Sequence, residues 1–102
     1  MTANELKTRV KLSVKSIDPE ARIILFGSRA RGDSKKYSDW DFLILTSLKP
    51  DSKFKMQIHN KLLDTELEAE EVISSLIYSH EKWKDYQITP LYKNISKDGI
   101  EL

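Results

Sequence analysis

Apolar residues near the start of the chain recur at helical spacing. They form one stripe along a helix predicted over residues 4–17, and the basic residues of this segment lie mostly off the stripe. Asp18-Pro19 follows and ends the helix, because a residue before proline disfavours helical backbone. The stripe consists of Leu6, Val10, Val14 and Ile17.

Two short apolar runs come next, and both have the pattern of buried strands. The first covers residues 22–26 and the second covers 40–46. The segment between them, 27–39, is polar and basic and too long for a tight hairpin turn. We therefore expect two strands joined by a long polar loop.

The second half of the chain continues with alternating helix and strand patterns. Together with the first half, it predicts an α+β domain, a small mixed β-sheet flanked by helices, which we place on one side of the sheet. The predicted elements are a helix over 53–69 that follows an N-cap at Asp51 or Ser52, a β-branched strand over 71–78, a short helix after Ser79, and a last helix from Thr89-Pro90 to Gly99.

Composition narrows the class of protein. The length of 102 residues fits one domain over 1–102. Lys and Arg number 17 against 16 Asp and Glu, and a net charge of +1 gives no support for bulk electrostatic binding to nucleic acid. The chain has no cysteine, which excludes disulfides and thiolate zinc sites.

The apolar runs are too short for a membrane protein. None approaches the roughly 20 residues that span a bilayer, and the first residues lack the apolar segment of a signal peptide. We expect a cytoplasmic protein without a membrane partner. A chain this small has little room for a separate substrate domain. A macromolecular substrate or a partner chain must therefore supply part of the recognition. The sequence leaves open whether the protein forms oligomers.

The loop after the first strand carries groups suited to phosphate. Gly27 allows the backbone to approach a ligand closely, and the Ser28 hydroxyl and exposed N–H groups at a helical turn can bind phosphate oxygens. Arg29 and Arg31 add cationic donors. Gly32 permits a sharp turn back towards the second strand.

Two carboxylates begin the second strand. Asp39 and Asp41 are two residues apart, so strand geometry turns both to one face, with Cα atoms about 6.6 Å apart. Two like charges on one face are costly unless a cation lies between them. Mg²⁺ is the natural cation, since it takes oxygen ligands and is completed by substrate phosphates and water. One or two ions would fit such a site.

These residues resemble the signature of the DNA polymerase β-like nucleotidyltransferases. The segment Gly27-Ser28-Arg29-Ala30-Arg31-Gly32-Asp33, followed by Ser38-Asp39-Trp40-Asp41-Phe42-Leu43-Ile44, looks most like the minimal nucleotidyltransferase type. The resemblance implies a mixed sheet with flanking helices, binding of Mg²⁺ and a nucleoside triphosphate (NTP), and transfer of a nucleoside monophosphate with release of pyrophosphate. It assigns Gly27 and Ser28 to the triphosphate, and Asp39 and Asp41 to the metal.

The chain departs from this signature at the third carboxylate. The family supplies one from a following strand, within an apolar-Asp-apolar triplet, but no aspartate lies in 66–79. Glu70 and Glu71 stand at the edge of the predicted third strand, and its middle holds Ser74 and Ser75. Either Glu70 or Glu71 serves, or the third carboxylate is missing. Its loss would remove the natural general base for the acceptor hydroxyl.

Three hypotheses follow. The first is a Mg²⁺-dependent nucleotidyltransferase that transfers AMP or another nucleotide to a hydroxyl; the resemblance implies a HEPN-type protein as partner in a toxin–antitoxin pair. The second is a catalytically degraded module of the same fold that binds nucleotide or docks on a partner. The third is a nucleic-acid binder using the basic loop. The near-zero net charge and the lack of a stacking platform in the loop argue against the third.

Overall fold

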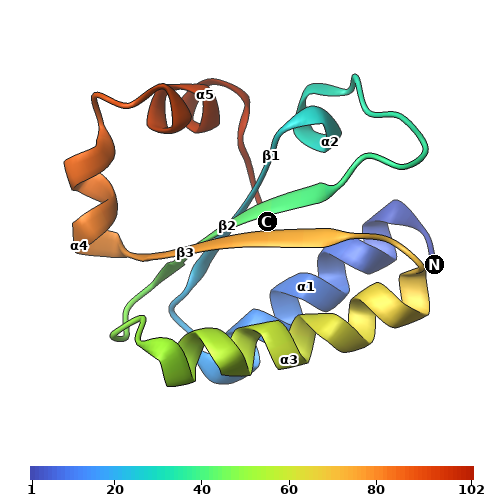
Figure 1. The fold of residues 1–102 in the computed structure, drawn as a ribbon, viewed down its shortest axis with the longest axis horizontal. Helices are drawn as coiled ribbons and strands as arrows, with labels where there is room; N and C mark the ends of the chain where they lie inside the picture. Colours follow the sequence, from blue (N-terminus) through green and yellow to red (C-terminus); the bar gives the residue numbers. More distant parts are fainter.

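A computed structural model describes all 102 residues. Helices and strands follow the predicted order closely (Figure 1). The elements are α1 (Ala3–Ile17), β1 (Arg22–Phe26), α2 (Ser28–Arg31), β2 (Trp40–Thr46), α3 (Ser52–Ala69), β3 (Ile73–Ser79), α4 (His80–Trp83), the 3₁₀ turn η1 (Lys84–Tyr86), α5 (Pro90–Asp98) and β4 (Ile100–Glu101).

The four strands form one mixed sheet in the order β3-β2-β1-β4. β1 pairs antiparallel with β2, and Phe26 lies opposite Asp41. β3 pairs parallel with β2, and Ser74 lies opposite Asp41. β2 is therefore a central strand, and its first residues lie between the end of β1 and the start of β3. The predicted α+β fold with a small mixed sheet is confirmed.

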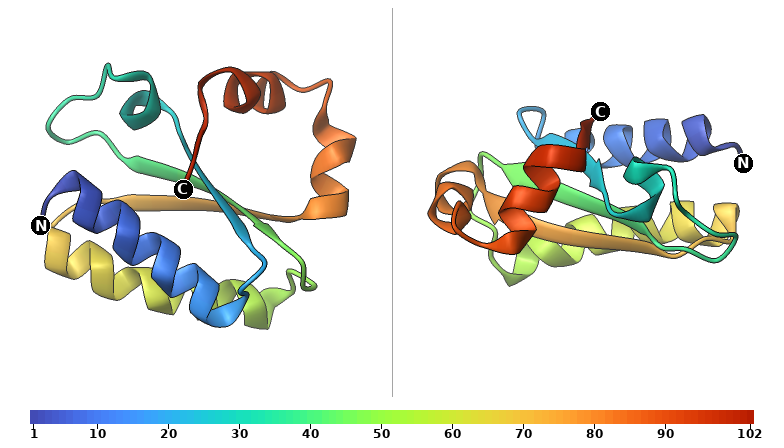
Figure 2. Two further views of the ribbon diagram at one scale, coloured as in Figure 1. Left: turned by 180° about the vertical axis from the view of Figure 1, so that it is seen from behind. Right: turned by 90° about the horizontal axis from the view of Figure 1, so that it is seen from above.

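Helices cover both faces of the sheet, so the prediction of helices on one side was wrong (Figure 2). Alternate residues of β2 enter two separate cores. Trp40, Phe42 and Ile44 pack with residues of α1 and α3, whereas Leu43 and Leu45 pack with Trp83 of α4 and Ile95 of α5. A strand apolar at successive positions needs cover on both faces, and the continuous run in β2 was the signal for this.

The start of β3 and the presence of β4 differ from the sequence prediction. β3 begins at Ile73 instead of residue 71, because Glu70 adopts a left-handed conformation (φ 55°) that ends α3. The short strand β4 was not predicted. It pairs with β1 through Ile24 and Leu25, and two residues after a helix are too few for a periodic pattern.

Polar side chains fix the ends of the long helices. Thr2 and Glu5 form a capping box at the start of α1, and Asp51 accepts a hydrogen bond from the Phe54 N–H at the start of α3. Asp18, just after α1, accepts hydrogen bonds from Thr46 and Ser47 at the end of β2. The Asp18 contacts fix the end of α1 against the sheet. No helix combines the length and the apolar character needed to cross a membrane.

Candidate active site

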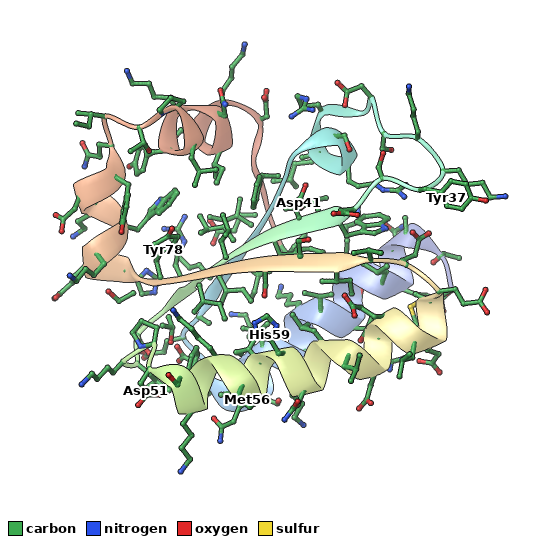
Figure 3. All side chains as sticks on the ribbon, in the orientation of Figure 1. Tyr37, Asp41, Asp51, Met56, His59 and Tyr78 are labelled. Carbon is green, nitrogen blue, oxygen red and sulfur yellow. The ribbon has the colours of Figure 1, made fainter.

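Gly27 brings the backbone at the end of β1 against the carboxylate of Asp41. Its φ of 76° and ψ of −159° belong to a region that only glycine adopts readily. A β-carbon at this position would lie 2.5 Å from Asp41 Oδ2, closer than non-bonded atoms tolerate. The residue type therefore sets how closely the turn and the carboxylate approach. Figure 3 shows Asp41 at the start of β2, facing α2.

The turn that follows leaves two backbone donors free. The N–H groups of Ala30 and Arg31 donate to the Gly27 carbonyl, but those of Ser28 and Arg29 find no acceptor within the chain. Gly32 ends the short helix α2 with a left-handed φ of 86°. Two free N–H groups and a serine hydroxyl next to Gly27 are suited to phosphate oxygens.

Asp39 lies close enough to Asp41 to affect the pKa of the Asp41 carboxyl. Asp41 is half-buried and Asp39, just before β2, is exposed. Burial raises the pKa of Asp41, and the negative charge of Asp39 raises it further, while the Arg31 guanidinium acts in the opposite direction. The charge coupling fits two carboxylates on one side of β2.

This donor set fits a hard divalent cation. Asp41 lies in a narrow space that only a glycine leaves open, and a second carboxylate opposes its ionisation. A cation held by both aspartates would relieve that repulsion, and oxygen ligands of this kind suit Mg²⁺. The chain contains no cluster of three or more His, Asp or Glu side chains placed to hold a metal ion. Any cation here would therefore complete its ligands with substrate oxygens and water.

Arg29 and Arg31 have different surroundings, although both belong to α2. The Arg29 guanidinium lies 4.6 Å from the Trp40 ring centroid and donates to the Ser38 carbonyl at 3.0 Å. It also lies 3.5 Å from the Glu71 carboxylate, and its side chain is only 15% exposed. Arg29 thus links α2, the loop before β2 and the segment before β3. Its side chain is engaged with the protein.

Arg31 is the more accessible cation of the pair. Its side chain is 45% exposed and lies 3.2 Å from Asp33. Its positive charge opposes the rise in the pKa of Asp41, which indicates that it lies near this carboxylate. A side chain with one exposed acidic partner can turn to an incoming phosphate at little cost.

Sequence comparison identifies the family. The profile described as Nucleotidyltransferase domain matches residues 7–99, which is most of the chain. The chain belongs to the nucleotidyltransferase domain family. The resemblance noted in the sequence is thereby confirmed. No curated protein matches the chain.

Two solved structures share this nucleotidyltransferase fold. One is a toxin–antitoxin complex crystallised with AMP-PNP, with a TM-score of 0.68, 18% identity, and coverage of 93% of this chain and 70% of the other. The second is a toxin–antitoxin complex named MntA-HpeT, with a TM-score of 0.61, 18% identity, and coverage of 100% and 72%. At such identities the likeness establishes the fold.

The structure does not bring a third carboxylate to the aspartates of this nucleotidyltransferase domain. Glu71 pairs with Arg29, and Glu70 is exposed at the left-handed end of α3. Neither forms a metal-binding cluster with Asp39 and Asp41.

Ser74 is the residue of β3 that lies opposite Asp41. Paired residues of parallel neighbours project to the same face, so a serine occupies the position nearest the aspartates. Sequence reasoning singled out Ser74 and Ser75 together and could not choose between them, because the register of β2 and β3 is a tertiary property.

Proposed function

We propose that this chain is a Mg²⁺-dependent nucleotidyltransferase that transfers a nucleoside monophosphate, AMP in the first instance, from an NTP to a hydroxyl acceptor. One observation carries the proposal. The Asp41 carboxylate meets Gly27 at the turn whose next two N–H groups are free. Groups for a cation and for phosphate thus converge at one point.

Each residue of the site has a defined task in this reaction. The N–H groups of Ser28 and Arg29 and the Ser28 hydroxyl donate to triphosphate oxygens. Gly27 has no side chain, so the backbone of this turn can approach the phosphates and Asp41 closely. Arg31 adds positive charge beside the phosphates. Asp39 and Asp41 hold Mg²⁺, which when bound offsets the negative charge that builds up on the phosphates.

The acceptor oxygen forms a bond to the α-phosphorus while the bond to pyrophosphate breaks. The hydroxyl proton leaves to water, because no third carboxylate stands beside Asp39 and Asp41. A well-placed general base contributes about 10²–10⁴-fold to rate. We therefore expect slower transfer than the fold could support with a complete set of carboxylates.

A partner protein is the acceptor that best suits so small a domain. The two structures that share the fold are toxin–antitoxin complexes, and one was crystallised with AMP-PNP. These descriptions support ATP as the nucleotide and a toxin as the protein that receives the AMP. That the toxin is of the HEPN type rests on the resemblance of the sequence to the minimal nucleotidyltransferases. On this proposal the chain is the antitoxin, and modification of the toxin silences it.

Ser74 favours a second candidate function. A serine opposite Asp41 is what a domain that has lost catalysis would carry. Such a module would still bind Mg–NTP through Asp39, Asp41 and the Gly27 turn, or would only dock on its partner. The two functions differ in whether a nucleotide is transferred, not in the fold.

Calorimetric titration with Mg–ATP tests nucleotide binding, which the transferase and the nucleotide-binding module have in common. We expect the protein to bind Mg–ATP, and the Asp39→Asn/Asp41→Asn variant to bind at least about tenfold more weakly, a loss of about 1.4 kcal/mol. Asp64→Asn, on the exposed surface of α3, is the control for loss of a carboxylate outside the site and should bind normally. No heat of binding from the folded protein would contradict the nucleotide site and leave only the docking function.

A further inference from the structure

Asp39, one of the two proposed metal ligands, has no backbone hydrogen bond of its own. Its N–H and C=O groups find no backbone partner within the chain, and its side chain is exposed. It lies just before β2, outside the sheet ladder. The position of this carboxylate therefore depends on how the chain is held on either side of it, at Ser38 and at Trp40.

Trp40 holds the side towards the sheet. Its N–H donates to the Val72 carbonyl at 2.9 Å, and its ring is buried in the core with residues of α1 and α3. On the other side, Ser38 belongs to a turn that is closed on itself. The Ser38 N–H donates to the Lys35 carbonyl, and the Ser38 hydroxyl accepts from the Lys35 N–H. These two bonds hold the turn together but do not attach it to the rest of the domain.

The Arg29 side chain attaches this turn to α2, which lies beside it (Figure 1). Its guanidinium donates to the Ser38 carbonyl at 3.0 Å through Nη2 and at 3.3 Å through Nε, and to the Lys36 carbonyl at 3.4 Å. The Ser38 carbonyl belongs to the peptide bond that leads into Asp39, so these bonds fix the plane of that peptide. One side chain thus connects the turn after Gly27 to the backbone of Asp39.

The guanidinium is itself held in place. It lies 4.6 Å from the Trp40 ring centroid and 3.5 Å from the Glu71 carboxylate, and the Arg29 side chain is only 15% exposed. A planar guanidinium can stack on a ring and donate in several in-plane directions at once, which an ammonium group cannot do. Glu71 therefore reaches the site through Arg29.

We infer that the Arg29 side chain is a positioning residue for Mg²⁺ binding, which fixes Asp39 relative to the Gly27 turn and is oriented by Glu71. The inference rests on the proposed function, and it assigns this side chain to the backbone before Asp39 and not to phosphate. A ligand that is already in place loses little conformational freedom when the metal binds. Residues that orient metal ligands contribute about 10–100-fold to metal affinity.

Positioning and charge predict different effects on ATP binding. A cation that attracts phosphate by its charge matters most for metal-free ATP, which carries more negative charge than Mg–ATP. A side chain that places Asp39 matters only for Mg–ATP, because metal-free ATP brings no cation for the aspartate to bind. The two roles of Arg29 can therefore be separated by measuring both affinities.

Calorimetric titration with ATP, once with Mg²⁺ and once with EDTA, makes this separation. We expect Arg29→Gln, which keeps the backbone N–H, to bind Mg–ATP at least about tenfold more weakly and metal-free ATP as the wild type does. Arg29→Lys keeps the charge but not the planar fork, and should behave in the same way. Arg31→Gln should weaken both affinities. Arg9→Gln, which removes an exposed ion pair with Glu68, is the control and should change neither.

A double variant tests whether Glu71 acts through Arg29. Glu71→Gln should weaken Mg–ATP binding less than Arg29→Gln does, and adding it to Arg29→Gln should cause no further loss. A further loss in the double variant would mean that Glu71 binds the metal itself, and would overturn its assignment as the group that orients Arg29.

The ¹³C chemical shift of the Ser38 carbonyl gives a readout without nucleotide or metal. It should move in Arg29→Gln and stay unchanged in Arg31→Gln, because only Arg29 donates to this carbonyl. Equal weakening of Mg–ATP and metal-free ATP by Arg29→Gln, or no weakening of either, overturns the inference and leaves the nucleotide site of the wild type standing. A wild-type protein that binds no Mg–ATP overturns the proposed function, and the inference with it.

Discussion

Gly27 has two separable properties, and both determine the site. Its backbone conformation disfavours other residue types, and the absence of a side chain leaves room for the Asp41 carboxylate beside the turn. The Gly-Ser and Asp-x-Asp pairs could be recognised in the sequence. The contact between Gly27 and Asp41 was not, because it depends on the pairing of β1 with β2.

Gly27→Ala should therefore abolish Mg–ATP binding and lower the free energy of unfolding by about 1–3 kcal/mol. Gly32→Ala separates the two causes. Gly32 also has a positive φ, but a β-carbon there would meet nothing within 4 Å. It should cost stability and leave binding largely intact. Equal loss of Mg–ATP affinity in both variants, measured by calorimetry, would show that backbone strain alone is responsible.

Ser74 is a position where a substitution should increase activity. Ser74→Asp would add a carboxylate opposite Asp41 and supply the general base that the site lacks. We expect faster nucleotidyl transfer, by up to about 10²-fold. Ser74→Asn is the control of matched size without charge. If the aspartate variant transfers no faster than the asparagine variant while both bind Mg–ATP, the missing carboxylate is not what limits the rate.

At the scale of elements, α2 joins the loop, β2 and the segment before β3 through one side chain. That both arginines of α2 bind nucleotide stays a prediction. Their surroundings differ, because the Arg29 side chain stacks on Trp40 and approaches Glu71, whereas that of Arg31 is more exposed. Sequence reasoning could not separate Arg29 from Arg31, because Trp40 and Glu71 reach Arg29 only through the folding of the sheet.

Arg29→Ala should lower the free energy of unfolding by about 2 kcal/mol, since it removes a largely buried cation with carbonyl and aromatic partners. Arg31→Ala removes a single exposed ion pair, and we expect a loss below about 1 kcal/mol. Urea denaturation of both variants checks the difference. A larger loss for Arg31→Ala would mean that the two roles are exchanged.

At the scale of the whole molecule, the helix and strand order followed from periodicity, but the layering did not. The continuous apolar pattern of β2 indicated a strand that needs cover on both faces, but it did not say which helices supply the second cover. Trp83 of α4 and Ile95 of α5 do so in the structure. Short α4 and α5 patterns do not reveal which face of the sheet they cover. Asp18 is a second example, because its partners Thr46 and Ser47 are distant in sequence.

Asp18 links the two halves of the domain and makes its stability depend on pH. Burial alone would raise the pKa of Asp18, but hydrogen bonds from Thr46, Ser47 and the Glu20 N–H hold it below its ordinary value of 3.8. The unfolded chain therefore takes up the proton first as pH falls. Stability from this group is fully present above about pH 3.8 and is lost as pH falls through the lower pKa of the folded state.

Asp18→Asn should cost about 1–3 kcal/mol at neutral pH and reduce the acid dependence of unfolding. A smaller dependence should remain, because hydrogen bonds from Arg22 also lower the pKa of Glu101. Urea denaturation across a series of pH values measures both effects. An unchanged acid profile in the variant would mean that Asp18 is not the group responsible.

The central claim is that Asp39 and Asp41 support nucleotidyl transfer. The most direct measurement is label transfer from α-³²P-labelled ATP, CTP, GTP or UTP, with Mg²⁺ and an extract of the source cells. We predict a labelled product, most strongly with ATP, that disappears with Asp39→Asn/Asp41→Asn and persists with Asp64→Asn. Its size would distinguish a protein acceptor from RNA or a small molecule. A folded protein that binds Mg–ATP but labels nothing with any nucleotide would contradict transfer and support the nucleotide-binding module.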